Sequence, residues 1–182
     1  MTHPSGMGPR AAVVVASNRA AAGVYDDTTG PVIVEALRDD GWEVESPVVV
    51  PDGEAVGEAI AAAVADGARA VLTTGGTGLT PTDRTPEVTR ALLDREVPGI
   101  AEAIRAHGTS QGVPTAALSR GLAGTVGDAL VVNLPGSRGG VRDGLVIVVP
   151  LLRHAVEQIA GGDHEQHSAG GDHEQHSAGS DH

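Results

Sequence analysis

The sequence feature that most constrains the fold is a short apolar segment that runs directly into a glycine-rich turn. Residues 70–74 read AVLTT, and residues 75–78 read GGTG. An apolar run of this length before a glycine cluster indicates a buried strand and then a sharp turn, because glycine adopts backbone conformations that other residues avoid. Farther on, Thr85, Pro86 and Glu87 are typical of a helix start, with Thr85 as the N-cap. The stretch therefore predicts a strand, a loop and a helix in succession.

The same loop predicts an anion site, since exposed backbone N–H groups beside a helix N-terminus attract phosphate. Asp83 places a carboxylate close to that site. A carboxylate beside a phosphate is favourable only with a cation between them, so we predict Mg²⁺ there. Two nucleotide-binding patterns are excluded: Walker A requires Lys-Ser/Thr where Leu79-Thr80 stands, and the dinucleotide fingerprint requires a third glycine that this loop lacks. A purely structural tight turn is the alternative explanation of the glycines.

Strand and helix patterns alternate along the chain, which predicts an α/β fold of three layers, α/β/α, with a mostly parallel central sheet. Ligands of such sheets bind beyond the carboxyl ends of the strands, so the residues that follow these ends should converge on one edge: Ser17, Asp52, Gly75 and Asn133. The expected strands are 11–16, 42–50, 70–73 and 129–134, with a weaker one at 114–118. The expected helices are 31–39, 53–66, 86–95 and 98–107, a helix from 138 that includes 145–149, and, after a break at Pro150, a last helix at 151–159.

Composition excludes several classes of protein. The formal net charge of −12 argues against a nucleic-acid partner, because phosphate contacts need clustered Lys and Arg. The absence of cysteine excludes disulfides, thiolate metal sites and a cysteine nucleophile, and is compatible with a reducing cytosol. No apolar run is long enough to span a bilayer, and residues 1–9 lack the pattern of a signal peptide, so we expect a cytoplasmic protein without a membrane partner.

The pattern divides the chain into three parts: a flexible N-terminus at 1–9, one domain at 10–160 and a tail at 161–182. In the tail, residues 162–170 are repeated without change as residues 171–179. The repeat is polar and has no core-forming residue larger than alanine, which predicts disorder. Five of the eight histidines lie there, and such a tail is able to capture Zn²⁺ or Ni²⁺ weakly, although a solvated extension without function explains it equally simply.

Several motifs, taken together, resemble one family. Residues 73–87, TTGGTGLTPTDRTPE, are similar to the signature of the MogA/MoaB family of molybdenum cofactor biosynthesis proteins, which includes the G domains of gephyrin-type proteins. Further matches follow in family order from about residue 13 to residue 159: SNR at 17–19, GVY at 23–25, DTTG at 27–30, VPD at 50–52, VPGI at 97–100, ALSR at 117–120 and NLPGS at 133–137. One departure is Asn18, where the family commonly has aspartate.

The resemblance implies a molybdopterin-binding-like fold and a Mg²⁺-dependent adenylylation of molybdopterin by ATP, which yields adenylyl-molybdopterin and pyrophosphate. It also implies a homotrimer and a molybdenum-insertion partner protein. Asp52 and Asp83 match acidic positions that the family uses in catalysis, and they would hold Mg²⁺. The substrate- and nucleotide-binding residues that the resemblance implies are Ser17, Thr29, Gly30, Thr74, Gly75, Gly76, Thr77, Gly78, Ser119, Arg120, Asn133, Pro135, Gly136 and Ser137.

Alternatives exist at two levels. Some MoaB-type members are not settled adenylyltransferases, so a carrier that binds molybdopterin or a precursor without ATP chemistry is the second hypothesis. An assembly protein that uses the same edge as an interface is the third, and it gives no reason for carboxylates beside a phosphate loop. Among single residues, Asp52 in Pro-Asp-Gly is also explained as a turn former or N-cap, and Asp83 as a partner of Arg84. Leu-Pro-Gly at 134–136 is common in ordinary turns, and we expect His107 and His154 to be structural.

Overall fold

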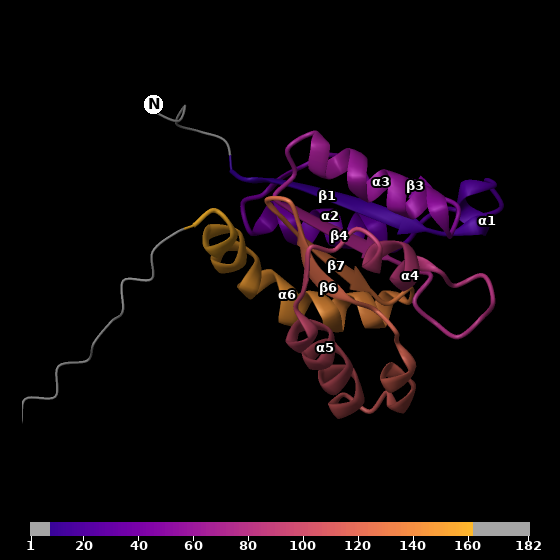
Figure 1. The fold of residues 1–182 in the computed structure, drawn as a ribbon. Helices are drawn as coiled ribbons and strands as arrows, with labels where there is room; N and C mark the ends of the chain where they lie inside the picture. Colours follow the sequence, from indigo (N-terminus) through magenta and orange to yellow (C-terminus); the bar gives the residue numbers. More distant parts are fainter. Residues whose placement is uncertain (1–7, 162–182) are drawn as a thin grey trace, which may run out of the picture.

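The computed structural model describes residues 8–161 and consists, in these residues, of one sheet with helices on both faces (Figure 1). The strands are β1 (Arg10–Ala16), β2 (Glu43–Val44), β3 (Val48–Val50), β4 (Ala70–Thr74), β5 (Arg95–Glu96), β6 (Ala123–Val126) and β7 (Ala129–Leu134). The helices are α1 (Asn18–Ala21), α2 (Gly30–Asp39), α3 (Glu54–Ala65), α4 (Thr85–Arg90), α5 (Pro98–Ser110) and α6 (Arg138–Ile159), with a 3-10 helix, η1 (Pro114–Leu118). The predicted fold class, α/β with a mostly parallel sheet, is confirmed.

The sheet has the order β2-β1-β4-β7-β6-β5, and β3 continues the edge strand beside β1. β1 runs parallel to β2, β3 and β4, and β4 runs parallel to β7. Among the described strands, β6 alone runs in the opposite direction, antiparallel to β5 and to β7. β3 lies on one side of β1 and β4 on the other, so the strand order reverses at β1, and ligands of parallel sheets commonly bind near such a reversal.

Two apolar layers hold the helices to the sheet. Because side chains alternate along a strand, β4 directs Leu72 to one face and Val71 to the other, and β7 does the same with Val132 and Val131. The first face packs against α2, α5 and α6, through residues that include Ile33, Leu37, Ile104, Val141, Val148 and Leu152. The second packs against α3 and α4, through Val56, Ile60 and Val88. All strands in the middle of the sheet are therefore buried on both faces.

Three predicted elements are wrong in type or extent. The expected strand 42–50 is interrupted at residues 45–47, where Pro47 cannot donate to a ladder. The expected strand 114–118 is the 3-10 helix η1, because Ala116 donates its backbone N–H to the carbonyl of Val113, and alanine is a poor strand former. The expected helix 86–95 ends at Arg90, and the chain then re-enters the sheet as β5, with Asp94 N–H bonded to Thr125 O at 2.8 Å.

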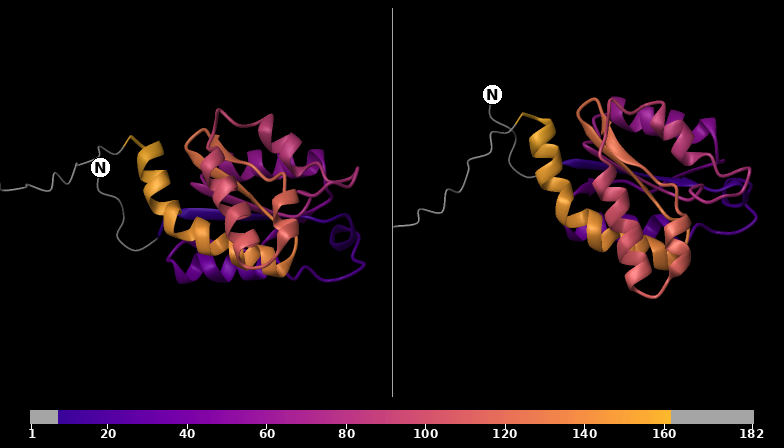
Figure 2. Two further views of the ribbon diagram at one scale, coloured as in Figure 1. Left: turned by 90° about the horizontal axis from the view of Figure 1, so that it is seen from below. Right: turned by 60° about the horizontal axis from the view of Figure 1, so that its bottom comes forward.

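The predicted break at Pro150 is also wrong, because α6 continues through it. Proline removes one hydrogen bond, the one to the carbonyl four residues earlier, which belongs to Val146. Val146 is 61% exposed, so that carbonyl lies on the water side, while Val148 and Leu152 stay buried on the sheet side. Figure 2 shows that α6 bends along its course, as expected for a helix with an internal proline.

Some expectations lie outside the described residues: most of the flexible N-terminus at 1–9 and nearly all of the His-rich tail at 161–182. The domain limits at residues 10 and 160 stay predictions. Within residues 8–161, no helix combines the length and apolar character that crossing a membrane requires.

Candidate functional site

The loops that leave β1, β3, β4 and β7 lie at the same edge of the sheet, because these strands are parallel (Figure 1). Ser17, at the end of β1, donates its backbone N–H to Val50 O at 2.9 Å. Asn18 accepts the backbone N–H of Asp52 on Oδ1 at 3.0 Å. The amide at position 18 therefore fixes the backbone of one predicted catalytic acid, a role that an aspartate could equally fill.

The turn after β4 is built on two glycines with positive φ, +90° at Gly75 and +63° at Gly76. A Cβ on Gly75 would overlap with the carbonyl oxygen of Ala16 in β1. A Cβ on Gly76 would overlap with the Asp52 carboxylate and with the Thr85 hydroxyl. Both positions thus require glycine, because conformation and space each exclude a side chain. Thr85 also donates its backbone N–H to Gly76 O at 3.1 Å, which closes the loop of residues 77–84 at its base.

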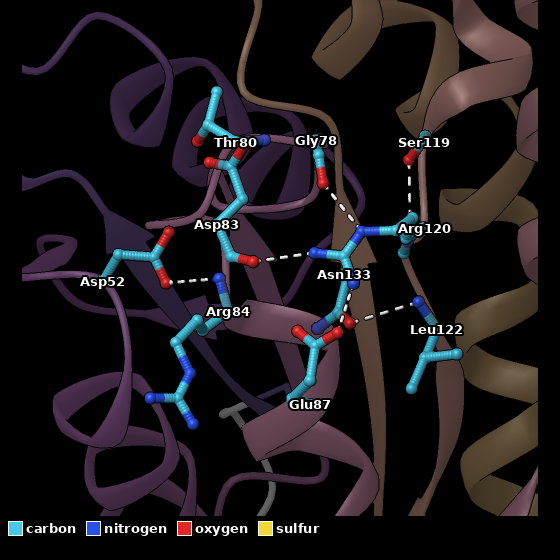
Figure 3. Close-up of polar contacts among 11 residues, drawn as sticks. Asp52, Gly78, Thr80, Asp83, Arg84, Glu87, Ser119, Arg120, Leu122 and Asn133 are labelled. Carbon is cyan, nitrogen blue, oxygen red and sulfur yellow. Dashed lines mark hydrogen bonds and ion pairs between the residues drawn. The ribbon is translucent and has the colours of Figure 1, made fainter.

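Asp52 lies beside this turn, partly shielded from water. Its Oδ1 accepts the backbone N–H of Arg84 at 3.0 Å (Figure 3). Burial raises the pKa of the Asp52 carboxyl above its usual value, backbone hydrogen bonds from Arg84 and Gly53 oppose this rise, and the negative charges of Asp83 and Glu87 add to it. A cation next to Asp52 would therefore stabilise the charged form of its carboxylate.

Asp83 lies at the other end of the glycine loop. Its Oδ2 accepts the backbone N–H of Thr80 at 3.0 Å, and a Cβ on Gly78 would come within 2.8 Å of the same oxygen. Among the described residues, Asp83 forms no ion pair with Arg84, whose guanidinium points away from both acids in Figure 3. The structure therefore brings Asp52 and Asp83 to one edge, where the two carboxylates flank the glycine loop.

Arg120 reaches this loop from the segment before β6 (Figure 3). Its Nε donates to Gly78 O at 2.7 Å, its Nη2 donates to Asp83 O at 2.7 Å, and its Nη1 pairs with the Glu87 carboxylate. Its backbone N–H donates to Thr77 O at 2.9 Å. The guanidinium is therefore engaged with protein atoms on all three nitrogens.

A cleft of about 410 Å³ opens on the side of the loop that faces α5 and α6. Ser137 caps the N-terminus of α6 at its floor, with Oγ accepting Gly140 N–H at 3.0 Å. The predicted site residues that line this cleft are Gly76, Thr77, Gly78, Asp83, Ser119, Pro135, Gly136 and Ser137. Arg105 and Asp143 also line it, although no sequence motif singled them out.

Other predicted site residues have structural contacts and lie away from the cleft. Thr29 donates its backbone N–H to Asp27, as does Gly30, and so both belong to the start of α2. Ser17 caps α1 through Ala20 N–H at 3.1 Å. Thr74 donates its hydroxyl to Pro135 O at 2.7 Å, which ties the end of β4 to the turn after β7.

Asn133 is only 2% exposed and lies within β7, where the prediction placed it at the strand end. Its amide nitrogen donates to Thr73 Oγ1 at 2.9 Å and to Thr89 Oγ1 at 3.0 Å, and its oxygen accepts Leu122 N–H at 3.1 Å. Its side chain thus joins β4, α4 and the start of β6, and a ligand in the cleft does not meet it.

Thr85 was predicted only as the N-cap of a helix, and that assignment is wrong by one residue. Arg84 is the N-cap of α4, and Thr85 is the first residue of the helix. Thr85 Oγ1 is the buried side-chain oxygen without a hydrogen-bond partner within residues 8–161. It lies next to the Asp52 carboxylate, because both would contact the same atom added at Gly76. The same residues contain no group of three or more His, Asp or Glu side chains placed to hold a metal ion.

Comparison with known proteins identifies the family of the chain. A family model described as a probable molybdopterin binding domain matches residues 12–154. The chain is 41% identical to a molybdenum cofactor biosynthesis bifunctional protein of Synechococcus elongatus over 155 residues, which are 85% of this chain and 48% of that protein. It therefore spans about half the length of this relative.

Two further relatives match nearly end to end. The chain is 34% identical to the molybdopterin adenylyltransferase of Helicobacter pylori strain J99, over 82% of this chain and 86% of the relative. The crystal structure of the molybdopterin biosynthesis enzyme MoaB from Thermus thermophilus superimposes with a TM-score of 0.77 at 44% identity, covering 84% of this chain and 96% of that chain.

Proposed function

Because this chain belongs to the family of probable molybdopterin binding domains, the MogA/MoaB family that its motifs predicted, we propose that it is a molybdopterin adenylyltransferase of molybdenum cofactor biosynthesis. The observation that carries the proposal is the arrangement at the carboxyl edge. A glycine loop and a cleft lie next to two carboxylates, Asp52 and Asp83. A phosphate-binding turn with acids on both flanks suits a reaction on a polyphosphate.

In the proposed reaction a phosphate oxygen of molybdopterin attacks the α-phosphorus of ATP. A bond forms between these two atoms, the bond from the α-phosphorus to the oxygen bridging to the β-phosphorus breaks, and pyrophosphate leaves with that electron pair. The nucleophile is already ionised near neutral pH, so no strong general base is needed. The protein has instead to hold the reactants in line and to stabilise the charge on the phosphates.

The backbone of the glycine loop suits the binding of those phosphates. Gly76, Thr77 and Gly78 line the cleft, and at Gly76 and Gly78 no side chain separates a ligand from the backbone. The N-terminus of α6, capped by Ser137, faces the same cleft and favours negative charge. Apolar atoms of Ile104 and Val113 on the opposite wall would shield the reactants from water.

The residues present also fit Mg²⁺, which prefers oxygen ligands. Asp52 Oδ2 takes no part in the hydrogen bond to Arg84, and Thr85 Oγ1 beside it has no partner among the described residues. Asp83 adds a second carboxylate from across the loop. We propose that Asp52 and Asp83 hold Mg²⁺, with Thr85 able to assist. The ion would neutralise phosphate charge and orient the leaving group.

A second candidate function is a carrier that binds molybdopterin or a precursor without ATP chemistry. The chain matches a MoaB structure, 44% identical, as fully as it matches the adenylyltransferase relative, so the similarity alone does not separate the two branches of the family. The carrier hypothesis explains the cleft, but it assigns no role to Asp52 and Asp83. We also propose that the protein is a homotrimer, that it has a molybdenum-insertion partner protein and that it is cytoplasmic. Light scattering of the purified chain tests the trimer.

Release of pyrophosphate from ATP in the presence of Mg²⁺ and molybdopterin tests the adenylyltransferase proposal. Asp83→Asn removes the charge and keeps the shape, and we expect turnover to fall by about 100-fold or more, as for loss of one stabilising group at a developing charge. Asp128→Asn, in the β6–β7 turn at the opposite edge of the sheet, is the matched control and should leave turnover unchanged.

The alternatives predict different results. Wild-type protein that binds molybdopterin but releases no pyrophosphate would support the carrier. Turnover that Asp83→Asn leaves unchanged would remove Asp83 from the mechanism.

A further inference from the structure

The loop that links the glycine turn to α4 protrudes from the edge of the sheet (Figure 1). Leu79, at its tip, is 67% exposed, and residues 79–82 are all exposed. Three internal hydrogen bonds shape it: Asp83 N–H donates to Thr80 O at 3.0 Å, Thr80 N–H donates to Asp83 Oδ2 at 3.0 Å, and the Thr80 and Thr82 hydroxyls share one at 3.2 Å. These bonds define a turn, but they do not attach the turn to the rest of the molecule.

Two backbone donors hold the base of the loop, Thr85 N–H on Gly76 O and Arg84 N–H on Asp52 Oδ1. Arg120 adds a side-chain attachment within the loop. Its Nε binds the carbonyl of Gly78 where the loop begins, and its Nη2 binds the carbonyl of Asp83 where the loop ends, both at 2.7 Å (Figure 3). The guanidinium is planar and its donors diverge in a fixed fork, so one side chain holds both ends at a set separation. Nη1 pairs with Glu87 on α4, which orients the fork.

Arg120 is itself held from both sides. Its backbone N–H donates to Thr77 O at 2.9 Å. Arg105, on α5, donates from Nη1 to Ser119 O and to Gly121 O, both at 3.2 Å. The segment 119–121 is thus fixed to α5 on one side and to the loop on the other, so Arg120 is anchored independently of the exposed residues that it holds.

We propose that Arg120 is a positioning residue that closes the loop of residues 78–83 and thereby aims the Asp83 carboxylate at the glycine turn. Nη2 holds the carbonyl of Asp83 while the Asp83 carboxylate holds Thr80 N–H, so the residue is fixed at two points. In this role Arg120 acts through Asp83 and does not bind a substrate phosphate. The catalytic consequence rests on the proposed adenylyl transfer, whereas the closure of the loop does not.

Arg120→Lys is the sharpest variant, because it keeps the positive charge but cannot reach two carbonyls with one fork. Hydrogen exchange of the Thr80 and Asp83 amides should accelerate by about tenfold or more, since the turn loses its attachment. In the pyrophosphate-release assay, the kcat of Arg120→Lys should be about 100-fold below that of the wild type, with the KM for ATP changed less than about threefold. This is the effect expected when a catalytic group is displaced by about 1 Å.

Arg10→Lys is the matched control. Arg10 also binds one carbonyl and one carboxylate, both of Asp66, but it does so at the amino ends of the strands. Exchange at Thr80 and Asp83, and turnover, should not change in this variant. If Arg120→Lys fails to fold, Arg105→Lys releases the segment 119–121 while Arg120 keeps its own contacts, and it should accelerate the same amides by a smaller factor.

The outcomes separate the hypotheses. Unchanged exchange in folded Arg120→Lys, or in Arg105→Lys where Arg120→Lys does not fold, overturns the proposal, whether or not the protein has adenylyltransferase activity. A KM for ATP raised by about tenfold or more in Arg120→Lys, with exchange unchanged, would make Arg120 a phosphate ligand and would also overturn it. Faster exchange without any turnover in the wild type would support the closure and refute only the proposed function.

Discussion

The glycine turn Gly75–Gly76 and the exposed loop Leu79–Thr82 are neighbours in the sequence, yet they are held in different ways. The turn is held by backbone geometry: both glycines have positive φ, and the carbonyl of Ala16 occupies the place of a Gly75 side chain. The exposed loop has no such packing. Beyond the backbone bonds from Arg84 and Thr85 at its base, it is held by the Arg120 side chain, which comes from about 40 residues farther along the chain. Asp83 lies at the end of the second region and Asp52 beside the first.

This difference teaches where rigidity at the proposed site comes from. Asp52 lies beside a turn that directly follows strand β4 and packs against β1, so its position follows from the fold. Asp83 lies beside a loop that few contacts hold, and such segments open at a much lower free-energy cost than core elements do. The two acids that would share one cation therefore differ in how firmly they are placed, and variants can separate the two causes.

The largest effect is expected for Gly75→Ala compared with Gly78→Ala. Alanine at position 75 needs a left-handed backbone and pushes against Ala16 O in β1, which cannot move without breaking the sheet. We expect Gly75→Ala to lower the free energy of unfolding by about 3 kcal/mol or more, from the sum of backbone strain and overpacking.

Gly78→Ala is the control within the same loop, because its Cβ meets only the Asp83 carboxylate at 2.8 Å and φ there is not positive. We expect a loss of less than about 1 kcal/mol, as for most surface substitutions, together with displacement of Asp83. Urea denaturation of both variants measures the difference. Equal losses would mean that the turn is not held by backbone geometry.

A smaller effect is expected for Asn133→Ala, which tests the buried network behind the turn. The change leaves Leu122 N–H without its partner and removes two bonds to threonine hydroxyls. An unsatisfied buried donor costs about 1–3 kcal/mol, so we expect about 2 kcal/mol in urea denaturation. Thr82→Ala in the exposed loop removes one hydroxyl contact at the surface and should change stability by less than about 0.5 kcal/mol. If Asn133→Ala lowered the free energy of unfolding by no more than Thr82→Ala does, the buried network would not contribute to stability.

These contrasts also explain what the sequence could predict. The parallel strands β1, β4 and β7 were predicted because apolar runs buried on both faces are readable without knowledge of their partners. The antiparallel edge was missed, since β5 has only two residues, Arg95–Glu96, and both are exposed. Gly124 in β6 leaves space for the Leu93 side chain and the Arg95 carbonyl, and no local sequence pattern predicts this tertiary contact.

The candidate site divides in the same way. The glycine turn could be predicted from adjacent residues, and the placement of Asp52 beside it followed from the expectation that parallel strands end at one edge. The roles of Asp52 and Asp83 in binding and catalysis stay predictions. Arg120 was predicted as a ligand-binding residue, and its contacts with Gly78 and Asp83 were not foreseen, because they span 42 and 37 residues. Asn133 was placed at a strand end by its motif, yet only the pairing of β7 with β4 buries it.

The smallest effect on stability is expected for Glu87→Gln, which tests how much the ion pair with Glu87 contributes to holding the Arg120 guanidinium. The Glu87 side chain is 49% exposed and that of Arg120 is 33% exposed, and exposed ion pairs contribute about 0–1 kcal/mol. Glutamine keeps an oxygen that accepts a hydrogen bond, so we expect a loss of about 0.5 kcal/mol at neutral pH. A loss well above 1 kcal/mol would mean that the carboxylate, and not the two loop carbonyls, is the main anchor of Arg120.

The pH dependence of that loss gives a second check. The hydrogen bond from Arg120 lowers the pKa of the Glu87 carboxyl below its ordinary value of 4.5, and the charges of Arg120 and Arg84 add to the lowering, while burial opposes it. A carboxyl with a lowered folded-state pKa stabilises the fold above its unfolded-state value, and this stabilisation is lost as the pH falls through the folded-state pKa. The difference in free energy of unfolding between wild type and Glu87→Gln should therefore be constant above pH 4.5 and shrink toward zero below it. Glu58→Gln, at an exposed position on α3, serves as the control. A difference that persists unchanged in acid would show that Glu87 acts through packing and not through its charge, and that the exposed loop is held by Arg120 without electrostatic help from α4.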